Sequence, residues 1–105
     1  MPKIARPTDD DTAVLPLSLL GNEAKVGIIR FLRANPNSTR QRIADGLGIT
    51  VATVSSYLAE FESAGVLLAN PSKGIRKRGD IPAYRVNSAI VTELYLQLGL
   101  ALGEI

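Results

Sequence analysis

Apolar residues recur at helical spacing in three consecutive stretches of the middle of the chain. The first stretch predicts a helix over residues 23–34, with Asn22 as its N-terminal cap. This helix should end before Pro36, because the residue that precedes a proline avoids helical geometry. One side of the helix is apolar and should face a core. Its basic residues are expected on the solvent side: Lys25, Arg30 and Arg33.

The next two stretches predict a pair of short helices joined by a tight turn. Ser38 and Gln41 have the spacing of a reciprocal capping box, and the two glycines within residues 45–49 permit a sharp turn. Thr50 is expected to cap the second helix, which ends at Gly65. Three apolar positions share a buried face of that helix: Val54, Leu58 and Phe61. This layout is typical of a helix-turn-helix, whose second helix presents its first residues to base edges.

A β-hairpin and a final helix are predicted after the helix pair. Residues 66–69 have strand character, and residues 83–86 alternate between apolar and polar side chains. Between them lies a long basic loop, residues 71–82, which would form the tip of the hairpin. The last helix is expected over residues 88–102. The fold class is therefore mainly α with a small β-hairpin.

The N-terminal end of the chain has a different character. Residues 1–12 carry two prolines and an acidic run and are interpreted as a flexible arm. Lys3 and Arg6 could let the arm touch a DNA minor groove, but the neighbouring aspartates favour a solvated tail. Residues 13–20 form an apolar lead-in, with Pro16 in the first turn of a short helix.

The order of these elements is that of a winged helix-turn-helix with an extra C-terminal helix. Over residues 19–87 the sequence also resembles this family, and in particular the ArsR-like repressors of bacteria and archaea. The segments that carry the resemblance are residues 25–32, 43–44, 47–49, 53–58, 65–67 and 84–86.

The resemblance implies a set of DNA contacts at the start of the second helix of the pair. Hydroxyl groups there can bond to base edges or phosphates, and small apolar groups can pack on a thymine methyl. The helix has no Arg or Lys between residues 51 and 64, so the strongest guanine contact is absent. The implied contact residues are Thr50, Val51, Ala52, Thr53, Ser55, Ser56 and Tyr57.

Basic residues gather instead in the predicted hairpin loop. Such a cluster suits phosphate contact at the place where winged domains make their second DNA contact, although a charged run can also be a solvated loop. Arg40 and Arg42, on the first helix of the pair, could flank the DNA backbone. The basic residues of the loop are Lys73, Arg76, Lys77 and Arg78.

The last helix is apolar on nearly all sides, and one small domain can cover only one of them. We therefore predict a homodimer in which this helix packs against its copy, with a central core helix as the alternative. The predicted interface comprises Ile90, Val91, Leu94, Tyr95, Leu98 and Leu102.

Composition narrows the chemistry further. The 105 residues carry a formal charge of only +2, but residues 23–87 hold ten Lys/Arg and five Asp/Glu, a local excess of +5. The chain has no Cys and no His, which leaves only carboxylates as charged metal ligands. No phosphate-binding glycine loop or set of paired carboxylates indicates an enzyme. The N-terminal residues lack an apolar signal core, and no apolar run reaches the roughly 18 residues that a membrane span needs.

The sequence thus predicts a DNA-binding transcriptional regulator without cofactor or metal, in the cytoplasm of a prokaryotic or virus-infected cell. It would be a dimeric repressor that reads an inverted repeat in double-stranded DNA. Residues 13–87 would form the DNA-binding domain and residues 88–105 the dimerisation helix. A winged helix that serves as a protein–protein interaction module in a larger assembly is the alternative.

Overall fold

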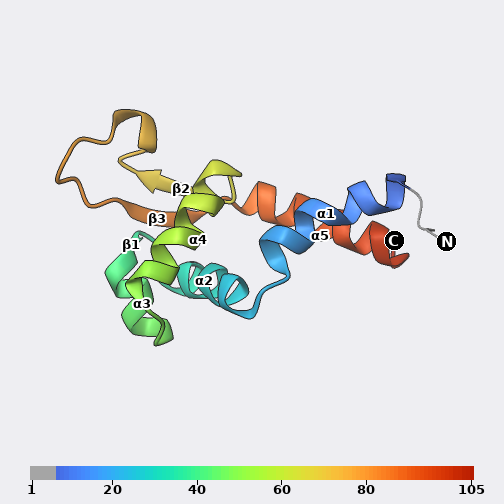
Figure 1. Ribbon diagram of the computed structural model, residues 1–105, viewed down its shortest axis with the longest axis horizontal. Helices are drawn as coiled ribbons and strands as arrows, with labels where there is room; N and C mark the ends of the chain where they lie inside the picture. Colours follow the sequence, from blue (N-terminus) through green and yellow to red (C-terminus); the bar gives the residue numbers. More distant parts are fainter. Residues whose placement is uncertain (1–6) are drawn as a thin grey trace.

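The computed structural model describes residues 7–105, and for residues 7–12 the backbone alone. Figure 1 shows a helical body with a small sheet, and a two-helix arm that projects from it. The helices are α1 (Pro7–Leu20), α2 (Glu23–Ala34), α3 (Arg40–Leu47), α4 (Val51–Ser63) and α5 (Ser88–Leu102). The strands are β1 (Ser38–Thr39), β2 (Leu67–Asn70) and β3 (Ala83–Val86), with a short 3-10 turn, η1 (Lys73–Ile75), between the last two.

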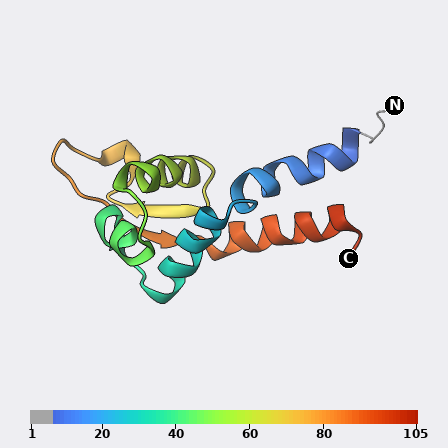
Figure 2. The ribbon, with the colours of Figure 1, turned by 60° about the horizontal axis from the view of Figure 1, so that its bottom comes forward.

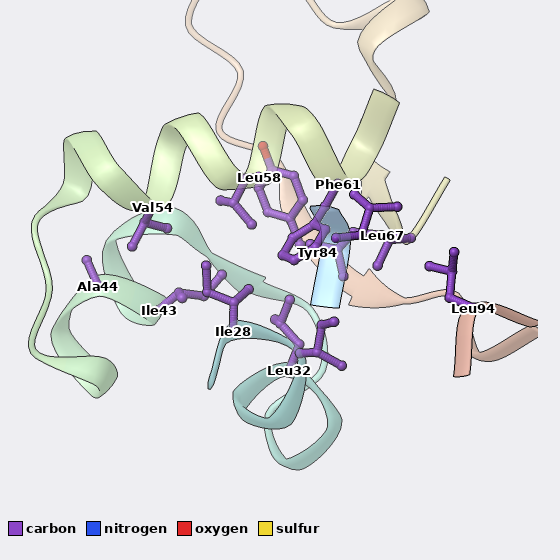
Figure 3. Close-up of a cluster of buried hydrophobic side chains, with 13 residues drawn as sticks. Ile28, Leu32, Ile43, Ala44, Val54, Leu58, Phe61, Leu67, Tyr84 and Leu94 are labelled. Carbon is purple, nitrogen blue, oxygen red and sulfur yellow. The ribbon is translucent and has the colours of Figure 1, made fainter. Parts of the chain in front are cut away.

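The core of the body lies where α2, α3 and α4 meet the sheet (Figure 3). The predicted buried face of α4 is confirmed, since Val54, Leu58 and Phe61 are at most 1% exposed. Ile28 and Ile43 reach the same cluster from α2 and α3. The predicted bounds of α2, β3 and α5 agree with the structure.

The three strands form an antiparallel sheet in the order β1-β3-β2. Leu67 pairs with Val86 in the predicted hairpin, which is confirmed. β1 was not predicted, because two residues carry no alternation pattern. Its Ser38 pairs with Tyr84 of β3, so the sheet joins the start of the helix pair to the returning strand of the hairpin.

Polar side chains set the helix ends. Asn22 accepts hydrogen bonds from the backbone N–H groups of Ala24 and Lys25, and the Thr50 hydroxyl accepts one from Thr53, so both predicted caps are confirmed. The cap predicted for α3 is wrong by one residue. Thr39 caps this helix, whereas the Ser38 hydroxyl is buried and donates to the carbonyl oxygen of Asn35 at 2.7 Å.

α1 and α5 lie side by side and project from one end of the body, while the hairpin tip projects from the other (Figures 1 and 2). α1 begins at Pro7, so residues 7–12, predicted to be part of a flexible arm, are helical; residues 1–6 lie outside the description. Pro16 is buried in the middle of α1, and the prediction that it lies in the first turn of a short helix is wrong. Over residues 7–105, no helix is both long and apolar enough to cross a membrane.

Candidate nucleic-acid interface

The turn between α3 and α4 brings several predicted contact residues to one exposed edge. Gly48 takes a left-handed conformation (φ 68°) that favours glycine, and α4 begins three residues later. At its start Ala52, Thr53 and Ser56 are exposed. The Thr50 hydroxyl donates to the Thr53 hydroxyl oxygen at 3.0 Å, which orients this edge. Val51 and Ser55 are half-buried beside it.

Tyr57 does not belong to this edge. Its hydroxyl oxygen accepts a hydrogen bond from the Asn22 side-chain amide at 3.2 Å, and its ring lies beneath the ammonium of Lys25. The ring therefore faces the start of α2 and not the exposed side of α4. The spacing of residues in the sequence did not show whether Tyr57 faces the exposed side of α4 or the start of α2.

A groove of about 500 Å³ separates α4 from the hairpin loop. Arg40 of α3, Ser55 of α4 and Lys73 of the loop all line it. These residues were predicted as contacts from three separate stretches of sequence, and the fold places them around one hollow. Ser72 and Tyr84 also line the groove and were missed, because neither belongs to the basic cluster or to α4.

Arg76 is held inside the domain. Its guanidinium donates to both carboxylate oxygens of Glu62 at 3.0 and 3.1 Å and to the carbonyl oxygen of Pro71. Glu62 also accepts the backbone N–H of Lys73, and both charged side chains of the pair are mostly buried. Arg76 thus ties the loop to the end of α4, and we call this pair the wing clamp.

The other predicted basic residues remain exposed. The side chains of Lys73, Lys77 and Arg78 are on the loop surface, and none of them forms an ion pair within the described residues. Arg42 is exposed on α3, where its backbone N–H donates to Thr39. The loop therefore exposes three of its four predicted basic residues, because Arg76 is paired with Glu62.

Tyr84 lines the groove. Its side chain is buried among the apolar side chains of the core (Figure 3). Burial raises the pKa of its hydroxyl above the ordinary value of 10.0, and Glu62 raises it further, while Arg76 and Arg40 oppose the rise. Tyr84 therefore stays neutral at physiological pH and can offer a hydroxyl donor to the groove.

The arm presents a second candidate surface of opposite character. Of the residues predicted for a dimer interface, Tyr95 and Leu102 are exposed, Ile90, Val91 and Leu98 are half-buried, and Leu94 is buried within the chain. Further large apolar side chains of the arm are exposed that the prediction did not include. They are Val14, Leu15 and Leu17 of α1 and Leu96 and Leu100 of α5. Those of α1 were missed because Pro16 made the segment look like a lead-in.

The chain is similar to known DNA-binding domains over this region. A family model described as winged helix-turn-helix DNA-binding matches residues 22–67, from the cap of α2 to the start of β2. That span contains the exposed edge of α4. No curated protein has significant sequence similarity to the chain.

Solved structures with the same fold include transcriptional regulators. The AntR antimony-specific transcriptional repressor has 18% sequence identity and a TM-score of 0.64, over 94% of this chain and 85% of its own. A fragment of a possible transcriptional regulatory protein from Mycobacterium bovis has 23% identity and a TM-score of 0.60, over 90% and 94%. A homodimeric winged helix-turn-helix domain of a possible ArsR-family regulator from Mycobacterium bovis has 22% identity and the same TM-score of 0.60, over 99% and 92%.

Proposed function

We propose that this chain, whose residues 22–67 match a winged helix-turn-helix DNA-binding family model, is a dimeric transcriptional repressor of the ArsR type. It reads an inverted repeat in double-stranded DNA. One observation carries the proposal: Arg40 of α3, Ser55 of α4 and Lys73 of the hairpin loop line one groove, on a domain whose other end is an apolar arm. DNA contact and dimer contact thus have separate surfaces.

The contact residues divide by the chemistry that they offer. Thr53 and Ser56 are exposed hydroxyls at the start of α4 and suit base edges in the major groove, where the neighbouring Ala52 can pack on a thymine methyl. The exposed cations of the loop suit phosphates, as does Arg40, which lines the groove. Arg76 and Tyr57 support these surfaces from within the domain.

The arm supplies the dimer. Leu15, Leu17, Leu96 and Leu100 are all at least 45% exposed, which is unfavourable for a chain that stays alone in water. A second copy that covers the arm would hide both helices at once, since α1 and α5 lie side by side. Two-fold symmetry would then set two α4 helices about one turn of DNA apart, roughly 34 Å.

The type of regulator is proposed from the similar structures. The AntR protein is a repressor, and one of the Mycobacterium bovis structures is a homodimeric DNA-binding domain. The signal that releases this chain from DNA is constrained by its composition. The absence of Cys and His from the sequence favours release by an organic ligand, a protein partner or dilution over release by thiolate-bound metal.

A polarisation titration tests the proposal. The full chain is titrated against random duplex DNA and against sites selected from a random library, at several salt concentrations. Affinity should fall steeply with salt, because cations that contact phosphates release counterions. Thr53→Ala with Ser56→Ala should reduce the preference for the selected site by ~1–3 kcal/mol and change random binding little. Absence of binding to every duplex at low salt would favour the interaction-module function instead.

A further inference from the structure

Lys25 is buried, although its place on α2 predicted a solvent-facing side chain. Only 7% of the residue is exposed. Its ammonium donates to the carboxylate of Glu60 at 2.8 Å and to the backbone carbonyl oxygen of Ser18 at 2.8 Å. It also lies 5.1 Å from the centre of the Tyr57 ring. A buried ammonium is costly unless it is paired and hydrogen-bonded, and these contacts satisfy it.

The partners of Lys25 come from two other helices. Ser18 lies in the last turn of α1, where carbonyl oxygens lack partners within the helix and the helix dipole favours a cation. Tyr57 and Glu60 lie one turn apart on α4. Asn22, which caps α2, adds its hydrogen bond to the Tyr57 hydroxyl. Among the hydrogen bonds of the described residues, Lys25 is the one side chain that bonds to both α1 and α4.

We propose that Lys25 is a positioning residue that fixes the recognition helix α4 relative to α1, one of the two helices of the dimer arm. The inference rests on the proposed function, in which α1 belongs to the dimer arm and α4 reads DNA. In a two-fold dimer, the placement of α4 relative to α1 sets the separation of the two recognition helices. The ammonium of Lys25 therefore sets which half-site spacing the dimer prefers, although it contacts no DNA.

The geometry favours positioning over simple stabilisation. The Glu60 side chain is 40% exposed, so it can be solvated when its partner is removed. Lys25→Met keeps an unbranched apolar stem of similar length over the Tyr57 ring and removes the bonds to α1 and α4. This variant should remain folded and lose the connection between the two helices.

The first test measures that connection without DNA. Because the sequence has no Cys, Ser18→Cys on α1 and Ser63→Cys on α4 give two unique spin-label sites, both on exposed side chains that are not among the leucines of the arm surface. Labelled chain is diluted in excess unlabelled chain, so that only distances within one chain are measured by pulsed electron spin resonance. Wild type should give a narrow distance distribution, and Lys25→Met a broadened or displaced one. Lys77→Met, on the exposed loop, is the matched control and should leave it unchanged.

An unchanged distribution in Lys25→Met would overturn the inference whatever the protein binds. If Lys25→Met does not fold, Glu60→Ala decides, since it removes the acceptor on α4 and leaves the bond from Lys25 to Ser18 on α1. A broadened or displaced distribution in Glu60→Ala supports positioning, and an unchanged one contradicts it.

The second test measures spacing preference on DNA. Selected inverted repeats are compared with copies whose spacer differs by one base pair. Wild type is expected to bind the selected repeat about tenfold more tightly than the altered copy, a ratio typical of one mismatched base pair. The two affinities of Lys25→Met should then differ by no more than about twofold. Its affinity for a single half-site should stay near that of wild type. Retained discrimination in Lys25→Met contradicts the inference, whereas failure of wild type to bind any DNA contradicts the proposed function alone.

Discussion

The body and the arm of this molecule bury their apolar side chains to different extents. In the body, three helices and a sheet enclose a core in which Ile28, Val54 and Phe61 are fully buried. In the arm, α1 and α5 cover each other on one side only, and Leu100 stays 57% exposed. Two helices cannot enclose a core alone. The body therefore covers most of its own apolar side chains, whereas the arm leaves many of its apolar side chains exposed.

The largest effect should come from the core of the body. Phe61→Ala should lower the free energy of unfolding by ~3–5 kcal/mol, because it removes a fully buried ring and leaves a cavity. Leu100→Ala, on the arm, should change the unfolding of the isolated chain by less than about 0.5 kcal/mol. Urea denaturation at low protein concentration measures both. Equal losses would mean that the arm is part of a shared core.

Charge on the arm should change assembly more than folding. Leu17→Glu with Leu100→Glu should convert the proposed dimer to a folded monomer, since each apolar side chain buried at an interface contributes ~1.5–3 kcal/mol. Light scattering and thermal melting measure assembly and folding separately. Leu68→Glu, an exposed leucine of β2 in the body, is the matched control. Leu94→Glu is unsuitable, because Leu94 is buried within the chain.

Cations of the body should affect DNA affinity according to whether they are paired. Lys77→Ala with Arg78→Ala should weaken binding to all sequences and reduce the salt slope by about 0.9 for each phosphate that is no longer neutralised. Arg76→Ala should instead release the wing clamp and lower stability by ~1–3 kcal/mol, because it leaves Glu62 without its partner. A smaller salt slope in Arg76→Ala than in the double variant would show that Arg76 leaves Glu62 to contact DNA. Assembly should be unchanged in both.

The smallest effect concerns pH and Tyr84. The pKa of Tyr84 is raised in the folded chain, so the folded state keeps its proton more firmly than the unfolded state. Stability from this group is fully present below its ordinary pKa of 10.0 and is lost as the pH rises through the folded value. Tyr84→Phe should therefore reduce the alkaline loss of stability above pH 10.0. An identical alkaline decline in both proteins, measured by denaturation, would contradict this.

Much of the body was determined by the sequence itself. Helix caps, the turn glycine and the buried face of α4 depend on residues within a few positions of one another, and these predictions agree with the structure for Asn22, Thr50 and Val54. The strands of the hairpin could be predicted because alternation and the intervening loop are also local signals. Among the caps, local rules failed at α3, where pairing of Ser38 with a distant strand changed the role of one hydroxyl.

Tertiary structure alone decided the roles of the charged and amphipathic side chains. Lys25 looked solvent-exposed until the fold placed Glu60, 35 positions away, beside it. Arg76 looked like an unpaired cation of the loop until Glu62, 14 positions away, accepted its hydrogen bonds. Leu94 looked available for a dimer interface until the fold buried it in the core of its own chain. A periodic pattern says which side of a helix a residue occupies. It does not say what lies opposite, because that neighbour comes from a remote part of the chain.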